Sequence, residues 1–115
     1  MMFRSLSKIL RHFSTSTPTL FERIVSRQIP AKIIYEDSQA LAFEDISPQA
    51  PVHFLVIPKV LNGLTKLSQA QENHKELLGH LLWVTQKVAK DRNLEKGFRV
   101  VINNGEEAGF FIIKY

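Results

Sequence analysis

The sequence has no cysteine among its 115 residues, which excludes disulfide bonds, cysteine-ligated zinc sites and thiol catalysis. No apolar run approaches the ~18 residues that a membrane-spanning helix needs. The signatures G-x-x-x-x-G-K-[ST], G-x-G-x-x-G and G-x-S-x-G are also absent, which argues against P-loop, Rossmann and α/β-hydrolase sites. Hydrophobic residues make up 44% and charged residues 23%, so we expect one globular domain rather than a disordered chain.

Acidic residues are missing from the first 21 positions, which contain three bases: Arg4, Lys8 and Arg11. The whole sequence has 15 Lys and Arg and 11 Asp and Glu. Without the three N-terminal bases, the rest of the chain has 15 − 3 = 12 bases and 11 acids. Because the basic excess belongs mainly to the N-terminal segment, a general nucleic-acid-binding surface is poorly supported.

The first thirteen residues have an amphipathic helical pattern, with apolar side chains on one side and the three bases on the other. A run of Ser, Thr and Pro follows at residues 14–19. Basic, acid-free and Ser-rich amphipathic segments are typical of mitochondrial transit peptides. We therefore expect residues 1–17 to be a targeting leader for the mitochondrial matrix, and residues 18–115 to be the folded domain. A disordered tail or a membrane-surface helix, with a cytoplasmic protein, is the alternative.

The remaining pattern predicts an α+β fold with an antiparallel sheet and one principal helix. Ser68 begins a capping-box pattern that is expected to open the long helix, and Gly97 is expected to stop it. Within the helix, an apolar row at Leu77, Leu81, Val84 and Val88 must face a sheet or a partner. The other predicted elements are a short helix at 20–25, strands at 32–36, 39–44, 53–58 and 98–103, and an apolar tail at 110–115.

Polar residues at strand ends are the candidate ligand-binding groups. Asp45 ends one predicted hairpin strand, Asn103 ends a later strand, and His53 opens the strand between them. Such groups above an apolar cleft suit a small ligand with hydroxyls or phosphate, although each is also common turn chemistry. His74 and His80 stand six apart on the helix, so they are interpreted as packing or solvated residues rather than metal ligands.

Residues 29–37 and 41–59 read IPAKIIYED and LAFEDISPQAPVHFLVIPK, and they are followed by LLGHL at 77–81, KGFRVV at 96–101 and NNG at 103–105. These stretches resemble the histidine-triad (HIT) superfamily in its HINT branch of nucleoside phosphoramidases. The resemblance implies an antiparallel sheet of about five strands per subunit, one long and one short helix, and a homodimer formed through the long helix. The mechanism it implies needs no obligatory redox cofactor, and we expect no cofactor and no metal site.

The resemblance also implies binding of a purine nucleotide such as AMP. Asp45 matches the aspartate that grips the ribose, Asn103 matches a residue beside the α-phosphate, and His53 matches a histidine next to the active-site cluster. The apolar base pocket is matched by Phe21, Ile24, Phe43 and Ile46.

One departure from the family concerns catalysis. The family hydrolyses nucleoside 5′-phosphoramidates with a nucleophilic histidine in the pattern His-φ-His-φ-His, but here Gly109 is followed by Phe-Phe-Ile-Ile-Lys-Tyr. We therefore expect a HIT domain that is truncated before this motif, has no catalytic residue and lacks phosphoramidase activity. The alternative is a non-enzymatic module that binds a nucleotide or another protein.

Overall fold

The computed structural model of the chain describes residues 20–28, 30–45, 48, 50–61, 63–64, 66–104 and 109–114. For residues 20–22, 103 and 109–114 the backbone alone is described. The predicted leader at residues 1–17 and the predicted pocket residue Ile46 lie outside these ranges.

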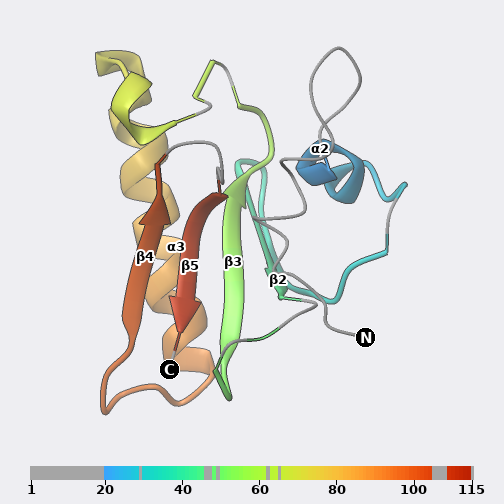
Figure 1. The fold of residues 1–115 in the computed structure, drawn as a ribbon, viewed down its shortest axis with the longest axis vertical. Coiled ribbons are helices and arrows are strands. Elements are labelled where there is room, and N and C mark those ends of the chain that lie inside the picture. The colour runs from blue at the N-terminus through green and yellow to red at the C-terminus, as the bar shows by residue number, and fades with distance from the viewer. Residues whose placement is uncertain are drawn as a thin grey trace.

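One antiparallel sheet forms the centre of the molecule, with strands in the order β1-β2-β3-β5-β4 (Figure 1). The long helix α3 lies across one face of the sheet, and the short helix α2 lies near β2 (Figure 1). This arrangement confirms the predicted α+β class. The bounds are α2 Leu20–Val25, β1 Ile33–Glu36, β2 Ala40–Glu44, β3 His53–Pro58, α3 Lys75–Asp91, β4 Arg99–Asn103 and β5 Gly109–Lys114.

Strand β3 is buried along its whole length because both faces of the sheet are covered. Phe54 and Val56 belong to the apolar cluster that also contains residues of α3. Leu55 and Ile57 point to the opposite face, where they pack with Ile24 of α2. His53 shares this second face with Leu55, since side chains alternate along a strand.

Helix α3 packs its apolar row against the sheet, not against a partner. Leu81 and Val84 are fully buried, and Val88 is 3% exposed. The outer surface of the helix carries Leu82 and Trp83, each half exposed. Among the described helices, none is long and apolar enough to cross a membrane.

The start of α3 differs from the prediction. Two short 3₁₀ turns, Leu67–Gln69 and Glu72–His74, precede the helix, which begins at Lys75. Ser68 lies inside the first turn, and the capping box is formed instead by Gln71 and His74. The Gln71 backbone N–H donates to His74 Nδ1 at 2.9 Å, which supplies an acceptor at the entry to the helix.

The predicted helix stop at Gly97 is also wrong, because the chain turns four residues earlier. Asn93 adopts a left-handed backbone with φ 62°, a conformation that asparagine tolerates better than most residues. The Leu94 N–H then donates to the Ala89 carbonyl, and the Asn93 N–H donates to the Lys90 carbonyl, both at 3.0 Å. This is the hydrogen-bond pattern of a Schellman motif.

Candidate functional site

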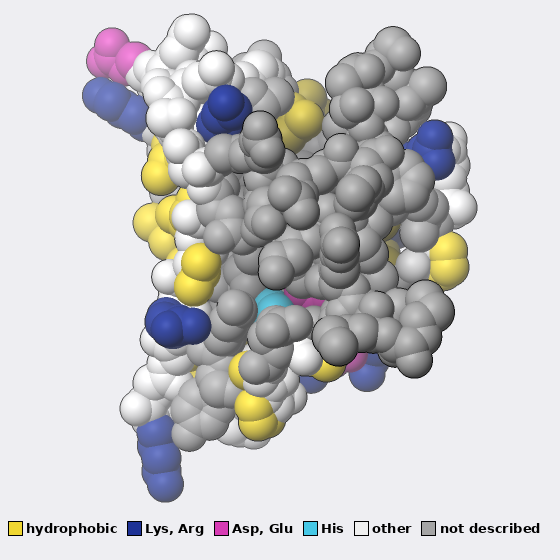
Figure 2. Space-filling view, in the orientation of Figure 1, with side chains coloured by type: hydrophobic (Ala, Val, Ile, Leu, Met, Phe, Trp, Pro, Cys, Tyr) yellow, Lys and Arg dark blue, Asp and Glu magenta, His cyan; other side chains and the backbone are white. Residues whose placement is uncertain are grey.

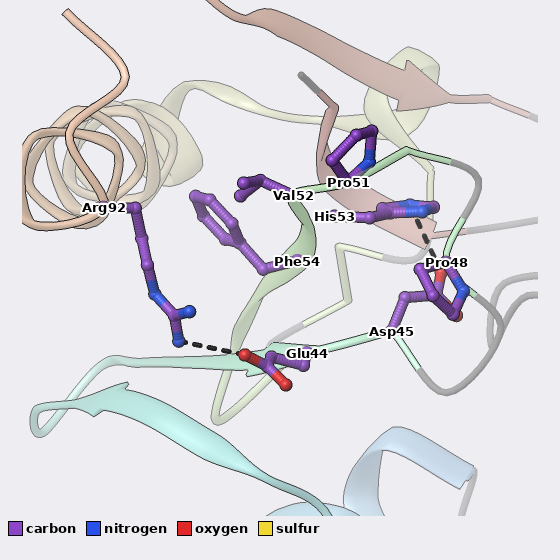
Figure 3. A pocket seen from close by; sticks show the side chains of 8 residues that line it. All are labelled: Glu44, Asp45, Pro48, Pro51, Val52, His53, Phe54 and Arg92. Atoms are coloured by element: carbon purple, nitrogen blue, oxygen red, sulfur yellow. Dashed lines mark ion pairs between the residues drawn. The ribbon is translucent and has the colours of Figure 1, made fainter.

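The candidate site is centred on Asp45 and His53 at the end of the β2–β3 pair. Asp45 follows β2 directly, and its backbone N–H donates to the His53 carbonyl at 3.1 Å. Their side chains meet as well, with Asp45 Oδ2 3.3 Å from His53 Nε2 (Figure 3). Sheet pairing therefore brings together two residues that the sequence placed on either side of a proline-containing loop.

Both members of this pair are almost completely removed from solvent. The Asp45 side chain is 0% exposed and the His53 side chain is 1% exposed. In an environment of low dielectric, a buried carboxylate and imidazole hold each other in place, because separating them leaves an uncompensated polar group. The pair therefore fixes the orientation of the Asp45 carboxylate.

A cavity of about 130 Å³ adjoins the pair (Figure 3). Arg92, at the C-terminus of α3, reaches across to Glu44 at 3.1 Å, and Lys32 lies 3.5 Å from the same carboxylate. Sequence reasoning missed Arg92, since no local pattern relates the end of a helix to a strand far away in the chain. The cavity is lined by Glu44, Asp45, Pro48, Pro51, Val52, His53, Phe54 and Arg92.

Two of the predicted base-pocket residues lie together on the face that carries the pair. Ile24 and Phe43 belong to one buried apolar cluster with Leu41, Leu55 and Ile57. Figure 2 shows this face, where a histidine and an adjoining acidic side chain are visible near the centre. Phe21 lies in α2 and Asn103 at the end of β4, with only their backbones described.

A second polar cluster, also missed by the sequence reasoning, joins the β1–β2 turn to α3. Asp37 accepts hydrogen bonds from the backbone N–H groups of Gln39 and Ala40 at 2.8 Å each, and from Tyr35 Oη at 2.9 Å. His80 Nε2 lies 2.6 Å from the same carboxylate. Burial by itself would raise the pKa of Asp37, but these hydrogen bonds outweigh it and lower the pKa to about 2.

The side chains at the candidate site are better suited to hydrogen-bonding a polar ligand than to nucleophilic attack. A buried, oriented carboxylate is a good acceptor for a pair of sugar hydroxyls. A histidine nucleophile needs a partner that orients it; Asp45 is such a partner for His53, but both side chains are almost completely buried. In the part of the chain that the structure describes, no group of three or more His, Asp or Glu side chains is placed to hold a metal ion.

The described residues form an α+β domain in which an antiparallel sheet packs against the long helix α3 and carries a buried carboxylate–imidazole pair. Residues 26–114 match the HIT domain, and the chain belongs to the HIT superfamily, in its HINT branch.

Relatives and solved structures agree with this assignment. The chain is 55% identical over 89 residues to a 14 kDa zinc-binding protein of Zea mays, covering 77% of this chain and 70% of that protein. It is 50% identical over 93 residues to Adenylylsulfatase HINT1 of Arabidopsis thaliana, covering 81% of this chain and 63% of that protein. A HIT family hydrolase from Legionella pneumophila superposes with a TM-score of 0.73 at 36% identity, covering 82% of this chain and 87% of that chain.

Proposed function

We propose that this 115-residue chain binds a purine nucleoside monophosphate, such as AMP, without hydrolysing phosphoramidates. The observation that carries the proposal is the buried Asp45–His53 pair, which holds a carboxylate in one orientation on the face that also carries Ile24 and Phe43. Membership of a nucleotide hydrolase family supports this ligand class. The name of one relative, Adenylylsulfatase HINT1, also supports an adenine nucleotide as the ligand.

In the proposed complex, Asp45 accepts hydrogen bonds from the ribose hydroxyls, as acidic residues do in dinucleotide-binding folds. Ile24 and Phe43, together with Phe21 and Ile46, provide the apolar side of the purine pocket. Asn103, at the end of β4, is assigned to the α-phosphate. Each of these roles comes from the family resemblance; in the structure Ile24, Phe43 and Asp45 are buried.

The proposed lack of turnover follows from the sequence after Gly109. Hydrolysis in this family requires a histidine that attacks the α-phosphorus, expels the amine and is then released by water. Here the corresponding stretch is Phe-Phe-Ile-Ile-Lys, which forms β5 between β3 and β4. Since this stretch contains no histidine, we assign it binding and electrostatic stabilisation rather than nucleophilic attack.

Titration calorimetry with AMP tests this proposal. We expect Asp45→Asn to weaken AMP binding about tenfold or more, because a charged acceptor for the ribose hydroxyls is lost. Asp91→Asn, at the exposed end of α3, removes the same charge away from the site and should bind like the parent chain. Circular dichroism establishes that both variants fold. Equal affinities for Asp45→Asn and the parent chain would contradict the proposed ribose contact.

A protein-interaction role is the second candidate, favoured by the outer surface of α3. Leu82 and Trp83 are each 50% exposed there, and Trp83 stacks on His80 with ring centroids 6.0 Å apart. We propose that this surface forms the homodimer contact. Failure of AMP to bind, with self-association retained, would favour this role over nucleotide binding.

A further inference from the structure

The carboxylate of Glu36 joins three segments of the chain through two ion pairs. Glu36 Oε1 lies 2.5 Å from Arg27 Nη2, and Glu36 Oε2 lies 2.5 Å from Lys59 Nζ. Arg27 follows α2, Glu36 ends β1 and Lys59 follows β3. The hydrogen bonds from Lys59 and Arg27 lower the pKa of Glu36, so its carboxylate is ionised at neutral pH.

Two of these three residues are fixed to the sheet. Glu36 pairs with Leu41 of β2, whose side chain packs on the face that carries α2. Directly paired residues of antiparallel strands share a face, so Glu36 also lies on the α2 side of the sheet. The Lys59 backbone N–H donates to the Gln39 carbonyl at 2.9 Å, at the same end of β2. The sheet therefore presents a fixed acceptor to Arg27.

Helix α2 has six residues and ends at a left-handed residue, Arg27, with φ 68°. The Gln28 N–H donates to the Arg23 carbonyl at 2.8 Å. The Arg27 N–H donates to the Ile24 carbonyl at 3.1 Å, which completes the Schellman pattern. A helix this short depends on tertiary contacts, and the left-handed conformation is costly for a residue with a Cβ. The ion pair with Glu36 opposes this cost and links the end of α2 to the sheet.

Ile24 is the residue through which α2 reaches the candidate site. Its side chain is 1% exposed and packs in one cluster with Phe43. Glu36 is remote from that site, because its partner Leu41 precedes Asp45 by four residues, or about 13 Å along a strand. A change at Glu36 therefore leaves the Asp45 carboxylate in place and acts through the position of α2.

We propose that Glu36 is a positioning residue, which holds Arg27 and so keeps α2 in contact with the sheet on the base side of the nucleotide site. This inference rests on the proposed nucleotide binding and adds the residue that sets its preference for a purine. Asp45 is oriented by His53, so recognition of the ribose does not depend on α2. Glu36 thus affects ligands that carry a base and spares ribose 5-phosphate.

Nuclear magnetic resonance titration of the 115-residue chain with AMP and with ribose 5-phosphate tests the inference. We expect Glu36→Gln to weaken AMP binding roughly two- to fivefold and to leave ribose 5-phosphate binding unchanged. Added salt should reduce the difference between this variant and the parent chain, because the pair is partly exposed. Amide hydrogen exchange of the ligand-free protein supplies a second readout. The Arg27 and Gln28 N–H groups should exchange severalfold faster in Glu36→Gln, while the amides of β2 exchange as in the parent chain.

A double-variant cycle separates positioning from a general loss of charge. Arg27→Gln should reproduce both effects of Glu36→Gln, and the two changes combined should have no larger effect than either alone, because they remove one interaction. Glu72→Gln is the matched control. It removes a carboxylate from another surface ion pair, with Lys75 at the start of α3, and should change neither readout.

The outcomes separate the inference from the proposed function. If AMP binds the parent chain and Glu36→Gln equally, or if Glu36→Gln weakens AMP and ribose 5-phosphate alike, the positioning role is overturned and nucleotide binding stands. If AMP does not bind the parent chain, the proposed function fails and amide exchange alone decides. Faster exchange of the Arg27 and Gln28 amides in Glu36→Gln would support Glu36 as the residue that positions α2, and unchanged exchange would overturn it.

Discussion

At the scale of single residues, the chain uses a histidine–aspartate contact twice, in two different settings. Asp45 and His53 are buried to 1% exposure or less and lie on the candidate ligand-binding face. Asp37 and His80 are roughly one-quarter exposed and connect the β1–β2 turn to α3. The first pair therefore fixes the orientation of a buried carboxylate, whereas the second connects the helix to the sheet.

The Asp37 cluster predicts a dependence of stability on pH. The pKa of this carboxyl is lowered from 3.8 to about 2, so its contribution is complete above 3.8 and is lost as the pH falls through 2. We expect thermal unfolding midpoints of the parent chain to fall over this interval, and Asp37→Asn to lower the midpoint at neutral pH and flatten the acid decline. Midpoints measured from pH 7 to pH 2 check this.

The control for that measurement is Glu95→Gln, which removes an exposed carboxylate after α3 and should leave the acid decline in place. A parent chain and an Asp37→Asn variant that lose stability in parallel would show that the four hydrogen bonds to Asp37 do not stabilise the folded state.

At the scale of elements, the end of α3 depends on one backbone conformation. Asn93 has φ 62°, so Asn93→Ala places a Cβ where the left-handed conformation is costly, and we expect a loss of about 1 kcal/mol in the free energy of unfolding. Asn93→Gly should be as stable as the parent chain or more so. Urea denaturation measures both, and an alanine variant with undiminished stability would contradict the role of this turn.

The elements that the sequence predicted are those that have a recognisable pattern of apolar and polar residues within their own segment. Alternation placed Leu41 and Phe43 on one face, and the apolar spacing of α3 predicted its buried row. The helix ends could not be placed in the same way, because Ser68 and Gly97 are typical cap residues, whereas here Gln71 caps the 3₁₀ turn before α3 and Asn93 ends the helix. The preferences for serine at helix starts and for glycine at helix ends are statistical averages, and the tertiary fold overrides them here.

The structure places Ile24, Phe43, Asp45 and His53 on one face of the sheet, and their roles in ligand binding stay predictions from the family resemblance. The contacts of Arg92 with Glu44 and of His80 with Asp37 could not be predicted, since each joins segments far apart in the chain. Such contacts depend on how α3 packs on the sheet, which local patterns do not encode.

At the scale of the whole molecule, the proposed homodimer can be tested on the outer surface of α3. Replacing Leu81 or Val84 by a charged residue would not test the interface. Both side chains are fully buried against the sheet, so the change would unfold the subunit. Trp83→Glu alters a half-exposed side chain instead. We expect it to convert a dimer to a folded monomer in analytical ultracentrifugation, because it removes apolar contact area and adds two like charges across the interface.

The matched control for that experiment is Gln28→Glu, an equally charged change at an exposed position after α2 and away from α3. It should leave the dimer intact. Sedimentation of the parent chain as a monomer, or of Trp83→Glu as an undiminished dimer, would contradict an interface at Leu82 and Trp83.

The central claim, nucleotide binding without turnover, is tested most directly by ³¹P nuclear magnetic resonance of adenosine 5′-phosphoramidate with the 115-residue chain. We predict that the phosphoramidate resonance shifts or broadens with added protein, and that no AMP resonance grows beyond the protein-free rate. Steady growth of AMP in proportion to protein concentration would contradict the account, because turnover requires a nucleophile and the proposal assigns none to this chain.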